Sequence, residues 1–244
     1  MQLSKRLFAV SEMVSSGFCL ADIGTDHGYI PIYLIEKERI PSAIAMDVNR
    51  GPLERARIHI REHGLEDRIQ TRLSDGLEKL APGEADTVLI AGMGGMLTIR
   101  ILEEGRDALE SVQELILQPQ SDIREVRAFL EKSGYWIDEE NMIEEDGKIY
   151  PMMRAVKNCG EGNAESDTGD GAHMTELELR YGPVLLKKEN PVLQKYLERE
   201  RQLLLRVRDK LLNEKGTAAL KRLEEIETEL VLNEEAGRRR TEWN

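Results

Sequence analysis

The stretch FCLADIGTDHGYIP, residues 18–31, combines a short apolar run with a loop that contains two glycines. A buried strand followed by such a loop and a helix is typical of the first unit of an open, doubly wound α/β sheet. Gly24 allows the chain to turn sharply after the strand, and Gly28 allows the loop to fold back onto the sheet. Between them stand Asp26 and His27, where a dinucleotide-binding loop usually has another glycine. The stretch therefore predicts an α/β fold with an acidic ligand-binding loop after its first strand.

The composition is that of a globular protein. Of the 244 residues, 33% are charged and 40% are hydrophobic, which is enough to bury a substantial core. No apolar run approaches the roughly 20 residues that a membrane-spanning helix needs. The N-terminal segment also lacks the long apolar run of a secretory signal. We therefore expect a cytoplasmic protein without a membrane partner, and we expect it to be a monomer without a metal site.

The first 157 residues alternate short β-rich runs with helical patterns, which predicts parallel strands joined by crossover helices. After Gly134, two strand-like runs flank the turn sequence EEDG, which predicts an antiparallel hairpin. Five parallel strands and a hairpin are typical of a class I, seven-stranded, Rossmann-like methyltransferase domain, whereas a nicotinamide-binding domain more often ends in a parallel sixth strand. The predicted strands span residues 18–23, 43–47, 69–73, 86–91, 114–117, 135–143 and 148–156, and the predicted helices span residues 4–14, 54–65, 95–105 and 123–135.

The remainder of the chain has a different character. Residues 158–173 are rich in Gly, Asp, Ser and Asn, which predicts a flexible linker. Beyond it, apolar residues recur at helical spacing over residues 193–211 and 220–230, which predicts an α-helical coiled-coil hairpin. The predicted domains are therefore a methyltransferase domain over residues 1–157, a linker over residues 158–174 and a helical domain over residues 175–244.

Charge is distributed unevenly between these parts. Residues 1–157 contain 19 Lys and Arg against 28 Asp and Glu, whereas residues 180–215 contain 10 against 5. A basic helical surface can contact nucleic-acid phosphates, although many charged helix faces are simply solvated. The candidate substrate-binding residues of this segment are Arg199, Arg206 and Arg208.

Three acidic residues lie at the carboxyl ends of three successive predicted strands. They are Asp22, Asp47 and Asp75. Open α/β sheets bind ligands at the carboxyl ends of their strands, where Asp47 is placed to accept hydrogen bonds from ribose hydroxyls. Asp75 could accept one from an adenine amino group. Each acid could instead cap a helix, but the three together favour a nucleoside site.

The acidic loop discriminates between nucleoside cofactors. A pyrophosphate would be repelled by Asp26, whereas S-adenosyl-L-methionine lacks phosphate and carries a cationic sulfonium and ammonium. The sequence therefore favours S-adenosyl-L-methionine over a nicotinamide dinucleotide. The candidate cofactor-binding residues are Asp22, Gly24, Thr25, Gly28, Asp47, Val48, Asp75, Gly76, Ala91, Gly92 and Met93.

The ends of the next two predicted strands offer a place for a base. Clustered glycines in AGMGG, residues 91–95, allow a planar group to approach, and Met93 could cover an adenine. The amides and the rigid proline of QPQ, residues 118–120, could line a base pocket. Both segments could also be simple turns. The candidate substrate-binding residues here are Gly94, Gly95, Gln118, Pro119 and Gln120.

Several motifs follow one another along the chain. They are LSKRL (residues 3–7), ADIGTDHGYIP (21–31), DGLE (75–78), GEAD (83–86), IAGMGG (90–95), LILQPQ (115–120) and EEDGKIY (144–150), with GPVLLKKENPVLQKYL (182–197) as a less distinctive addition. This set resembles the bacterial tRNA adenine-N1 methyltransferases of the TrmK type, which modify a D-loop adenine at position 22. The resemblance implies methyl transfer from S-adenosyl-L-methionine to N1 of that adenine, and a helical domain that helps to hold tRNA.

The resemblance also implies that Asp26, His27 and Tyr29 face the transferred methyl group or the target base, and these are the candidate catalytic residues. Adenine N1 carries an in-plane lone pair, so the reaction needs positioning and electrostatics rather than a strong base. Asp26 could stabilise the cationic product or take an amino proton, with His27 or Tyr29 as orienting or stacking partners. Because N1 is occupied in a base pair, the adenine must be unpaired or flipped out.

Two other functions remain open from the sequence. The first is a nicotinamide-dependent oxidoreductase, which Asp26 and the terminal hairpin disfavour. The second is a non-catalytic RNA-binding coiled-coil adaptor, which the three strand-end acids disfavour.

Overall fold

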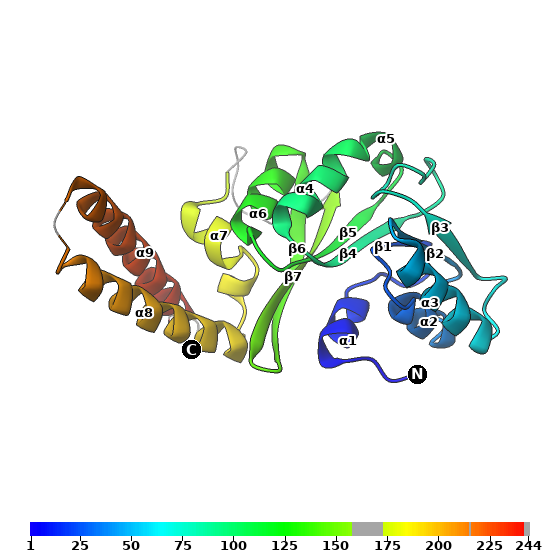
Figure 1. Ribbon diagram of the computed structural model, residues 1–244, viewed down its shortest axis with the longest axis horizontal. Helices are drawn as coiled ribbons and strands as arrows, with labels where there is room; N and C mark the ends of the chain where they lie inside the picture. The colour runs from blue at the N-terminus through cyan, green and yellow to red at the C-terminus, as the bar shows by residue number, and fades with distance from the viewer. Residues whose placement is uncertain (158–172, 215, 242–244) are drawn as a thin grey trace. The chain divides into compact units, whose positions relative to one another are not determined.

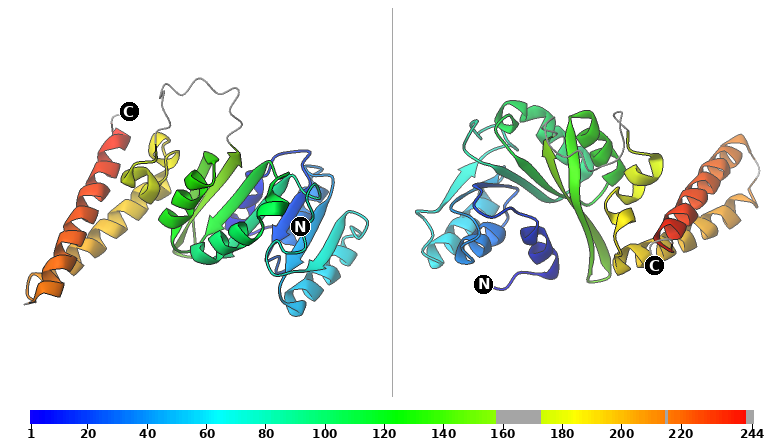
Figure 2. Two further views of the ribbon diagram at one scale, coloured as in Figure 1. Left: turned by 90° about the horizontal axis from the view of Figure 1, so that it is seen from above. Right: turned by 180° about the vertical axis from the view of Figure 1, so that it is seen from behind.

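The computed structural model describes residues 1–157, 173–214 and 216–241. The chain forms two compact units, Met1–His173 and Met174–Asn244. The first unit is a sheet flanked by helices and the second contains a long helical hairpin (Figures 1 and 2). The linker predicted over residues 158–174 lies almost entirely outside the described residues.

The sheet of the first unit has seven strands in the order β3-β2-β1-β4-β5-β7-β6. Its strands are β1 (Leu20–Ile23), β2 (Ala43–Asp47), β3 (Ile69–Leu73), β4 (Thr87–Met93), β5 (Glu114–Pro119), β6 (Tyr135–Glu145) and β7 (Lys148–Lys157). Strands β1 to β5 are parallel, whereas β7 pairs antiparallel with both β5 and β6. The terminal antiparallel hairpin confirms the predicted class I methyltransferase topology.

Helices cover both faces of this sheet (Figure 1). One face carries α1 (Lys5–Glu12), α2 (Tyr29–Glu36) and α3 (Arg50–Glu62), and the other carries α4 (Gly95–Glu104), α5 (Arg106–Leu109) and α6 (Ile123–Lys132). Every residue of β1, β2 and β5 is consequently buried, as expected of strands covered on both sides.

Helix α2 was not among the predicted helices. Five of its eight residues are buried, so its sequence YIPIYLIE has no polar stripe that would reveal a helical period. Pro31 lies in its first turn, where a missing backbone N–H costs no intrahelical hydrogen bond. The preceding Gly28 is the N-cap and has a φ of 68°, a left-handed conformation that favours glycine.

The second unit contains α7 (Glu176–Tyr181), a 3-10 turn (Leu185–Lys187), α8 (Pro191–Leu211) and α9 (Thr217–Thr241). Helices α8 and α9 form the predicted hairpin, with Leu204, Ile226 and Leu230 in its apolar seam. Leu220 was expected in that seam but is 62% exposed, so the apolar contact is shorter than predicted.

A polar network, which the sequence did not predict, joins α7 to the hairpin. Arg180 binds both Glu200 and Glu229, at 3.0 and 2.8 Å. The Tyr181 hydroxyl donates to Glu200, and the Asn233 side chain donates to the Leu197 carbonyl and to Glu200. Burial and the Glu200 carboxylate raise the pKa of the Tyr181 hydroxyl above its usual range. The network fixes α7 against α8 and α9.

A buried ion pair ties α6 to β6. Arg127 Nε lies 2.9 Å from a carboxylate oxygen of Glu140, and the two side chains are 1% and 0% exposed. Removing one partner leaves an uncompensated charge in the core, whereas removing both leaves none.

We expect Arg127→Met to lower the free energy of unfolding by about 3–5 kcal/mol, because the buried Glu140 would lose its ion pair with Arg127. The double variant Arg127→Met, Glu140→Leu should stay within about 2 kcal/mol of the wild type. Urea unfolding followed by circular dichroism measures both values. A double variant as unstable as the single one would contradict this account.

Candidate active site

The carboxyl ends of β1 and β2 bring two predicted cofactor residues together. Asp22 and Asp47 are only 7% and 8% exposed. The loop after β1 crosses the end of β2, because the N–H groups of Gly24 and Thr25 both donate to the Met46 carbonyl, at 2.8 and 2.9 Å. The neighbouring parallel strands therefore place both carboxylates in one buried site.

Burial raises the pKa of Asp22 to about 6, the nearby Thr25 side chain opposes this rise, and the Asp47 charge adds to it. Asp47 accepts a hydrogen bond from the Asn49 N–H at 2.7 Å, so it also organises the start of α3. Within the described residues, neither carboxylate is in an ion pair. A buried acidic pair without its own cation favours a positively charged ligand.

The third predicted acid has a different environment. Asp75 is 55% exposed, and its carboxylate lies 3.3 Å from Arg100 on α4. The following Gly76 has a φ of 51°, and a Cβ there would lie 3.1 Å from the Ile101 side chain. Asp75 is thus held at the surface by a weak, exchangeable ion pair rather than buried with the other two acids.

The end of β4 lies against the loop after β1. A Cβ on Gly24 would be only 2.2 Å from the Met93 methyl group, and the φ of 77° at Gly24 favours glycine, so a larger residue would strain the backbone and displace the Met93 side chain. Gly92 has a φ of 82°, and Ala91 and Met93 are half-buried beside it. Val48, directly after β2, is 57% exposed. The residues predicted to hold a nucleoside thus come from adjacent strand ends.

The QPQ segment differs from its predicted role as a base pocket. Gln118 is fully buried, accepts a hydrogen bond from Arg6 at 2.9 Å and donates to the Pro119 carbonyl at 3.2 Å. Pro119 is also buried, and only Gln120 is exposed. Arg6 lies in the LSKRL motif and was not a predicted site residue, and a Cβ on Gly92 would lie 3.4 Å from its guanidinium. Arg6 therefore lies against the ends of β4 and β5.

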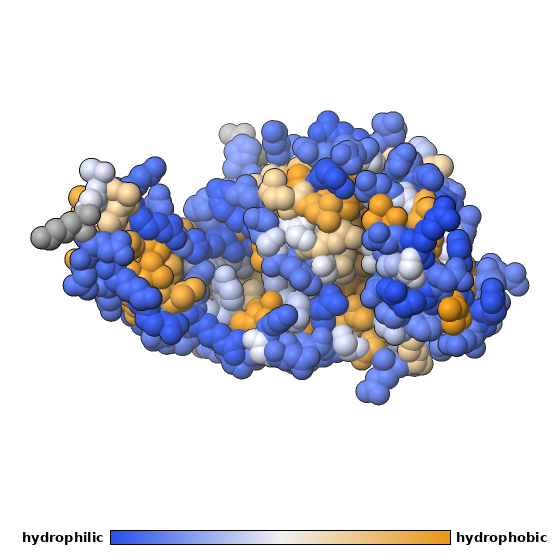
Figure 3. Space-filling model, viewed as in Figure 1, coloured by the Kyte–Doolittle hydropathy of each residue, from blue (hydrophilic) through white to orange (hydrophobic). Residues whose placement is uncertain are grey.

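The two glycines at the start of α4, which were predicted to bind substrate, also have structural roles. A Cβ on Gly95 would lie 2.4 Å from the Ser121 carbonyl, so this glycine is needed for packing whether or not substrate binds. Gly94 is the N-cap of α4. Met96 and Leu97 follow and are 58% and 40% exposed. Apolar atoms gather at the surface over α4 (Figure 3), which offers a base an apolar contact.

The predicted catalytic residues lie in a stack of rings. The rings of His27 and Tyr29 are 4.9 Å apart with an interplanar angle of 6°. His59 of α3 lies 5.3 Å from both. His59 Nδ1 is 3.0 Å from the His27 carbonyl oxygen, which can only accept, so Nδ1 donates this hydrogen bond. His59 therefore fixes both the backbone and the ring of the loop.

Asp26 has two partners at the edge of this stack. One carboxylate oxygen is bound by Arg55 of α3, and the other lies 3.3 Å from His27 Nε2. The sequence indicated that Arg55 and His59 belong to an amphipathic helix, but not that this helix faces the loop. Their spacing of four residues on one helix was the available signal.

The three predicted hairpin arginines are on α8. Arg199 and Arg206 are exposed, and Arg206 Nε donates to the Gln202 carbonyl at 3.2 Å. Arg208 is half-buried and lies 3.2 Å from Asp209.

The expected basic character of the hairpin is wrong for the unit as a whole. Residues 174–244 contain 15 Lys and Arg against 14 Asp and Glu, because α9 contributes acids that residues 180–215 lack. Glu234 and Glu229 of α9 lie 4.0 Å from Arg201 and 3.4 Å from Arg222. Phosphate contacts by this unit would therefore depend on individual exposed cations, such as Arg199 and Arg206, rather than on its net charge.

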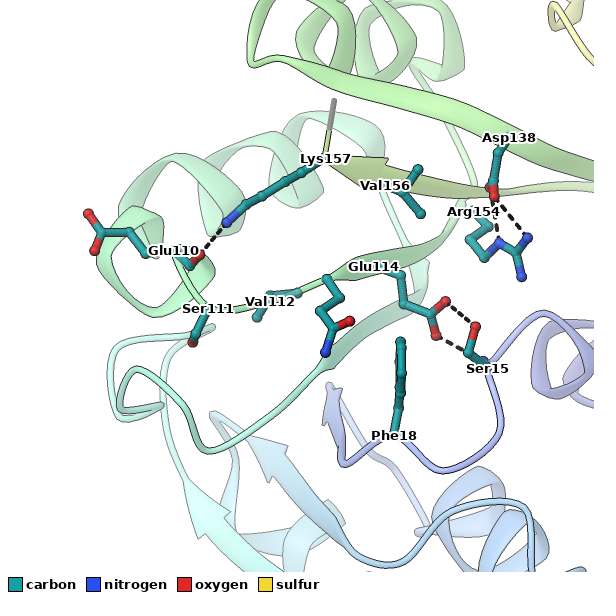
Figure 4. A pocket seen from close by; sticks show the side chains of 11 residues that line it. Ser15, Phe18, Glu110, Ser111, Val112, Glu114, Asp138, Arg154, Val156 and Lys157 are labelled. Atoms are coloured by element: carbon teal, nitrogen blue, oxygen red, sulfur yellow. Dashed lines mark hydrogen bonds and ion pairs between the residues drawn. The ribbon is translucent and has the colours of Figure 1, made fainter. Parts of the chain in front are cut away.

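A separate cavity of about 450 Å³ lies at the opposite end of the parallel strands, where β5 begins (Figure 4). Its polar groups satisfy one another. The Glu114 carboxylate accepts from Ser15 and Thr87, and Arg154 binds Asp138 at 2.8 Å. This cavity is distinct from the strand-end site. Among the described residues there is no cluster of metal-binding side chains and no helix long and apolar enough to span a membrane.

Comparison with known proteins agrees with this geometry. A family model described as a methyltransferase domain matches residues 3–153. The fold is accordingly that of a methyltransferase domain.

Individual relatives are more specific. The chain is 39% identical over 202 residues to the tRNA (adenine(22)-N(1))-methyltransferase of Bacillus subtilis, covering 83% of this chain and 82% of that protein. The crystal structure of the B. subtilis m1A22 tRNA methyltransferase TrmK matches with a TM-score of 0.85 and 33% identity, covering 96% of this chain and 98% of that one. M. capricolum TrmK, solved with S-adenosyl-homocysteine, matches with a TM-score of 0.80 and 28% identity over 96% and 97%.

The chain therefore belongs to the family of tRNA (adenine(22)-N(1))-methyltransferases. This confirms the resemblance inferred from the sequence motifs. Neither a nicotinamide oxidoreductase nor a non-catalytic adaptor receives support from these relatives.

The raised pKa of Asp22 predicts a pH-dependent stability. Between pH 3.8, its unperturbed pKa, and about 6, the folded state binds more protons than the unfolded state, so ionisation of Asp22 above this window costs stability. Without cofactor, Asp22→Asn should be more stable than the wild type at pH 8 by up to about 3 kcal/mol. The difference should shrink below pH 6 and be largely lost by pH 4. Thermal unfolding across this range measures it, and a difference independent of pH would contradict the assignment.

Proposed function

We infer that this protein transfers a methyl group from S-adenosyl-L-methionine to N1 of adenine 22 in the D-loop region of tRNA. The observation that carries this inference is the buried carboxylate pair of Asp22 and Asp47 in a chain that matches an m1A22 methyltransferase over 83% of its length. The related M. capricolum structure contains S-adenosyl-homocysteine, the product of the same methyl donor.

The residues present suit this cofactor. Its positive charges match the Asp22 and Asp47 carboxylates, which lack a cation of their own among the described residues. Thr25 Oγ1 is buried beside them without a well-formed hydrogen bond, so a ligand could satisfy it. When bound, S-adenosyl-L-methionine supplies an electrophilic methyl group. Asp22, Asp47 and the glycine loop would hold and orient it, with Val48 and Met93 available to the adenine.

The loop residues can act on the target base. Adenine N1 attacks through its own lone pair, so no side chain must first remove a proton. The Asp26 carboxylate is 62% exposed at the edge of the ring stack, where it would stabilise the positive charge that methylation places on the base. Tyr29 and His27 present flat rings next to it, which suits the stacking of an unpaired adenine.

The expected partners follow from this reaction. We propose that the protein acts on tRNA in the cytoplasm as a monomer, with no membrane partner. Light scattering of the purified protein with and without tRNA tests the monomer, and a stable dimer would contradict it.

Mapping of methylated nucleosides by mass spectrometry tests the reaction. After incubation of tRNA with protein and S-adenosyl-L-methionine, we expect one new 1-methyladenosine, at position 22. Asp26→Asn should lower kcat by about a hundredfold or more, because the charge opposite the cationic product is lost. Cofactor affinity should not change.

The matched control is Asp67→Asn, which changes an exposed acid after α3, and it should keep full activity. Full activity of Asp26→Asn would remove Asp26 from the mechanism. Methylation at another position would overturn the assigned substrate atom.

The hairpin arginines can be tested separately. Arg199→Glu and Arg206→Glu should each weaken tRNA binding by about tenfold and reduce the salt dependence of binding by about one phosphate contact. Affinity for S-adenosyl-L-methionine serves as the control and should be unchanged. Filter binding at several salt concentrations measures the effect, and unaltered tRNA affinity would exclude these residues from the interface.

A further inference from the structure

The candidate catalytic carboxylate is engaged by a cation in the structure. Arg55 Nη2 binds one oxygen of Asp26, and His27 Nε2 lies 3.3 Å from the other. The side chains of Asp26 and Arg55 are 62% and 47% exposed. One oxygen of the group expected to face the base is therefore already bound by a cation.

This arrangement opposes the proposed chemistry. Methylation places a positive charge on adenine, and a guanidinium bound to Asp26 would repel that charge and neutralise the carboxylate that should stabilise it. Efficient methyl transfer therefore requires Arg55 to leave Asp26, or to be neutralised by another anion. An exposed ion pair contributes only about 0–1 kcal/mol, so such an exchange is energetically accessible.

The surroundings of Arg55 suit an RNA phosphate as the replacement anion. Residues 1–173 contain 19 Lys and Arg against 32 Asp and Glu, yet α3 itself contains four Arg against two Glu. This locally basic helix lies against the catalytic loop, because a Cβ on Gly28 would contact the Ala56 side chain at 3.5 Å. A guanidinium also pairs well with phosphate through two parallel hydrogen bonds. An RNA strand that delivers a base to the loop would bring its phosphates to α3.

We propose that Arg55 exchanges partners during the reaction: it binds Asp26 in the free protein and a phosphate of tRNA in the complex. This inference rests on the proposed tRNA methyltransferase function. Binding of the substrate then frees the Asp26 carboxylate for the base. Arg55 would be both a tRNA-binding residue of the first unit and the residue that couples binding to the exposure of the catalytic charge.

Arg57 offers a matched control on the same helix. It is 48% exposed, close to the value for Arg55, and it is paired with an acid, Glu54, and with Thr71. It lies two residues from Arg55 and therefore points in a different direction. Arg57→Gln removes the same charge from α3 without touching the loop.

The test measures tRNA affinity and single-turnover rate for Arg55→Gln, Arg55→Lys and Asp26→Asn. Arg55→Gln should bind tRNA about five- to tenfold more weakly and reduce the salt dependence by about one contact, with an undiminished rate at saturating tRNA. Arg55→Lys should bind more tightly than Arg55→Gln. Asp26→Asn should bind tRNA about two- to fivefold more tightly than the wild type, since it no longer competes for Arg55. Arg57→Gln should change affinity less than twofold.

Weaker tRNA binding by Arg55→Gln together with tighter tRNA binding by Asp26→Asn would support the exchange. A lower saturated rate for Arg55→Gln with unchanged tRNA affinity would overturn it, because Arg55 would then only position Asp26. Unchanged behaviour of Arg55→Gln would also overturn it. Absence of 1-methyladenosine with the wild type would instead refute the proposed function, so the two failures are distinguishable.

Discussion

The burial of two like charges side by side is the constraint on which this structure depends. Parallel pairing of β1 with β2, and the crossing of β2 by the loop after β1, hold Asp22 and Asp47 out of water together. Such a pair is unfavourable until a cation reaches it. The glycines of the loop, the contact of Met93 with Gly24 and the hydrogen bond from the Asn49 N–H to Asp47 all help to maintain this arrangement. Burial of the Asp22 and Asp47 carboxylates is thus unfavourable in the free protein, and a cationic ligand bound beside them would offset this cost.

The positive charge of residues 180–215 does not extend to the second unit as a whole. The acidic residues of α9 offset the cations of α8. Some polar side chains of the second unit, such as those of Arg180, Tyr181 and Asn233, belong to the network around Glu200 and Glu229. The strongly acidic first unit, in contrast, has a basic helix directly beside its catalytic loop. Under the proposed function, RNA contacts near the target base would be local, and the hairpin would need to contribute only a few exposed arginines.

Local sequence patterns predicted those features that depend on short stretches of chain. Strand ends, glycine turns and the β6–β7 hairpin follow from spacing alone, so Asp22, Gly24 and Asp47 could be placed in advance. Helix α2 could not, because an element buried on nearly all sides has no amphipathic period. The burial of Gln118 against Arg6 and the meeting of Arg55 with Asp26 depend on packing between distant segments. Periodicity defines the faces of a helix but not the loop that one of those faces will meet.

The hydrogen bond from His59 to the His27 carbonyl couples the loop after β1 to the buried core of α3. It makes the shape of the catalytic loop a property of α3, whose buried face rests on Leu53, Ala56 and Ile60. A conservative change at one of these apolar positions would rotate His59 and displace the loop while every residue near the substrate stayed the same. A substitution in the buried core of α3 would then reduce activity, although no residue near the substrate had changed.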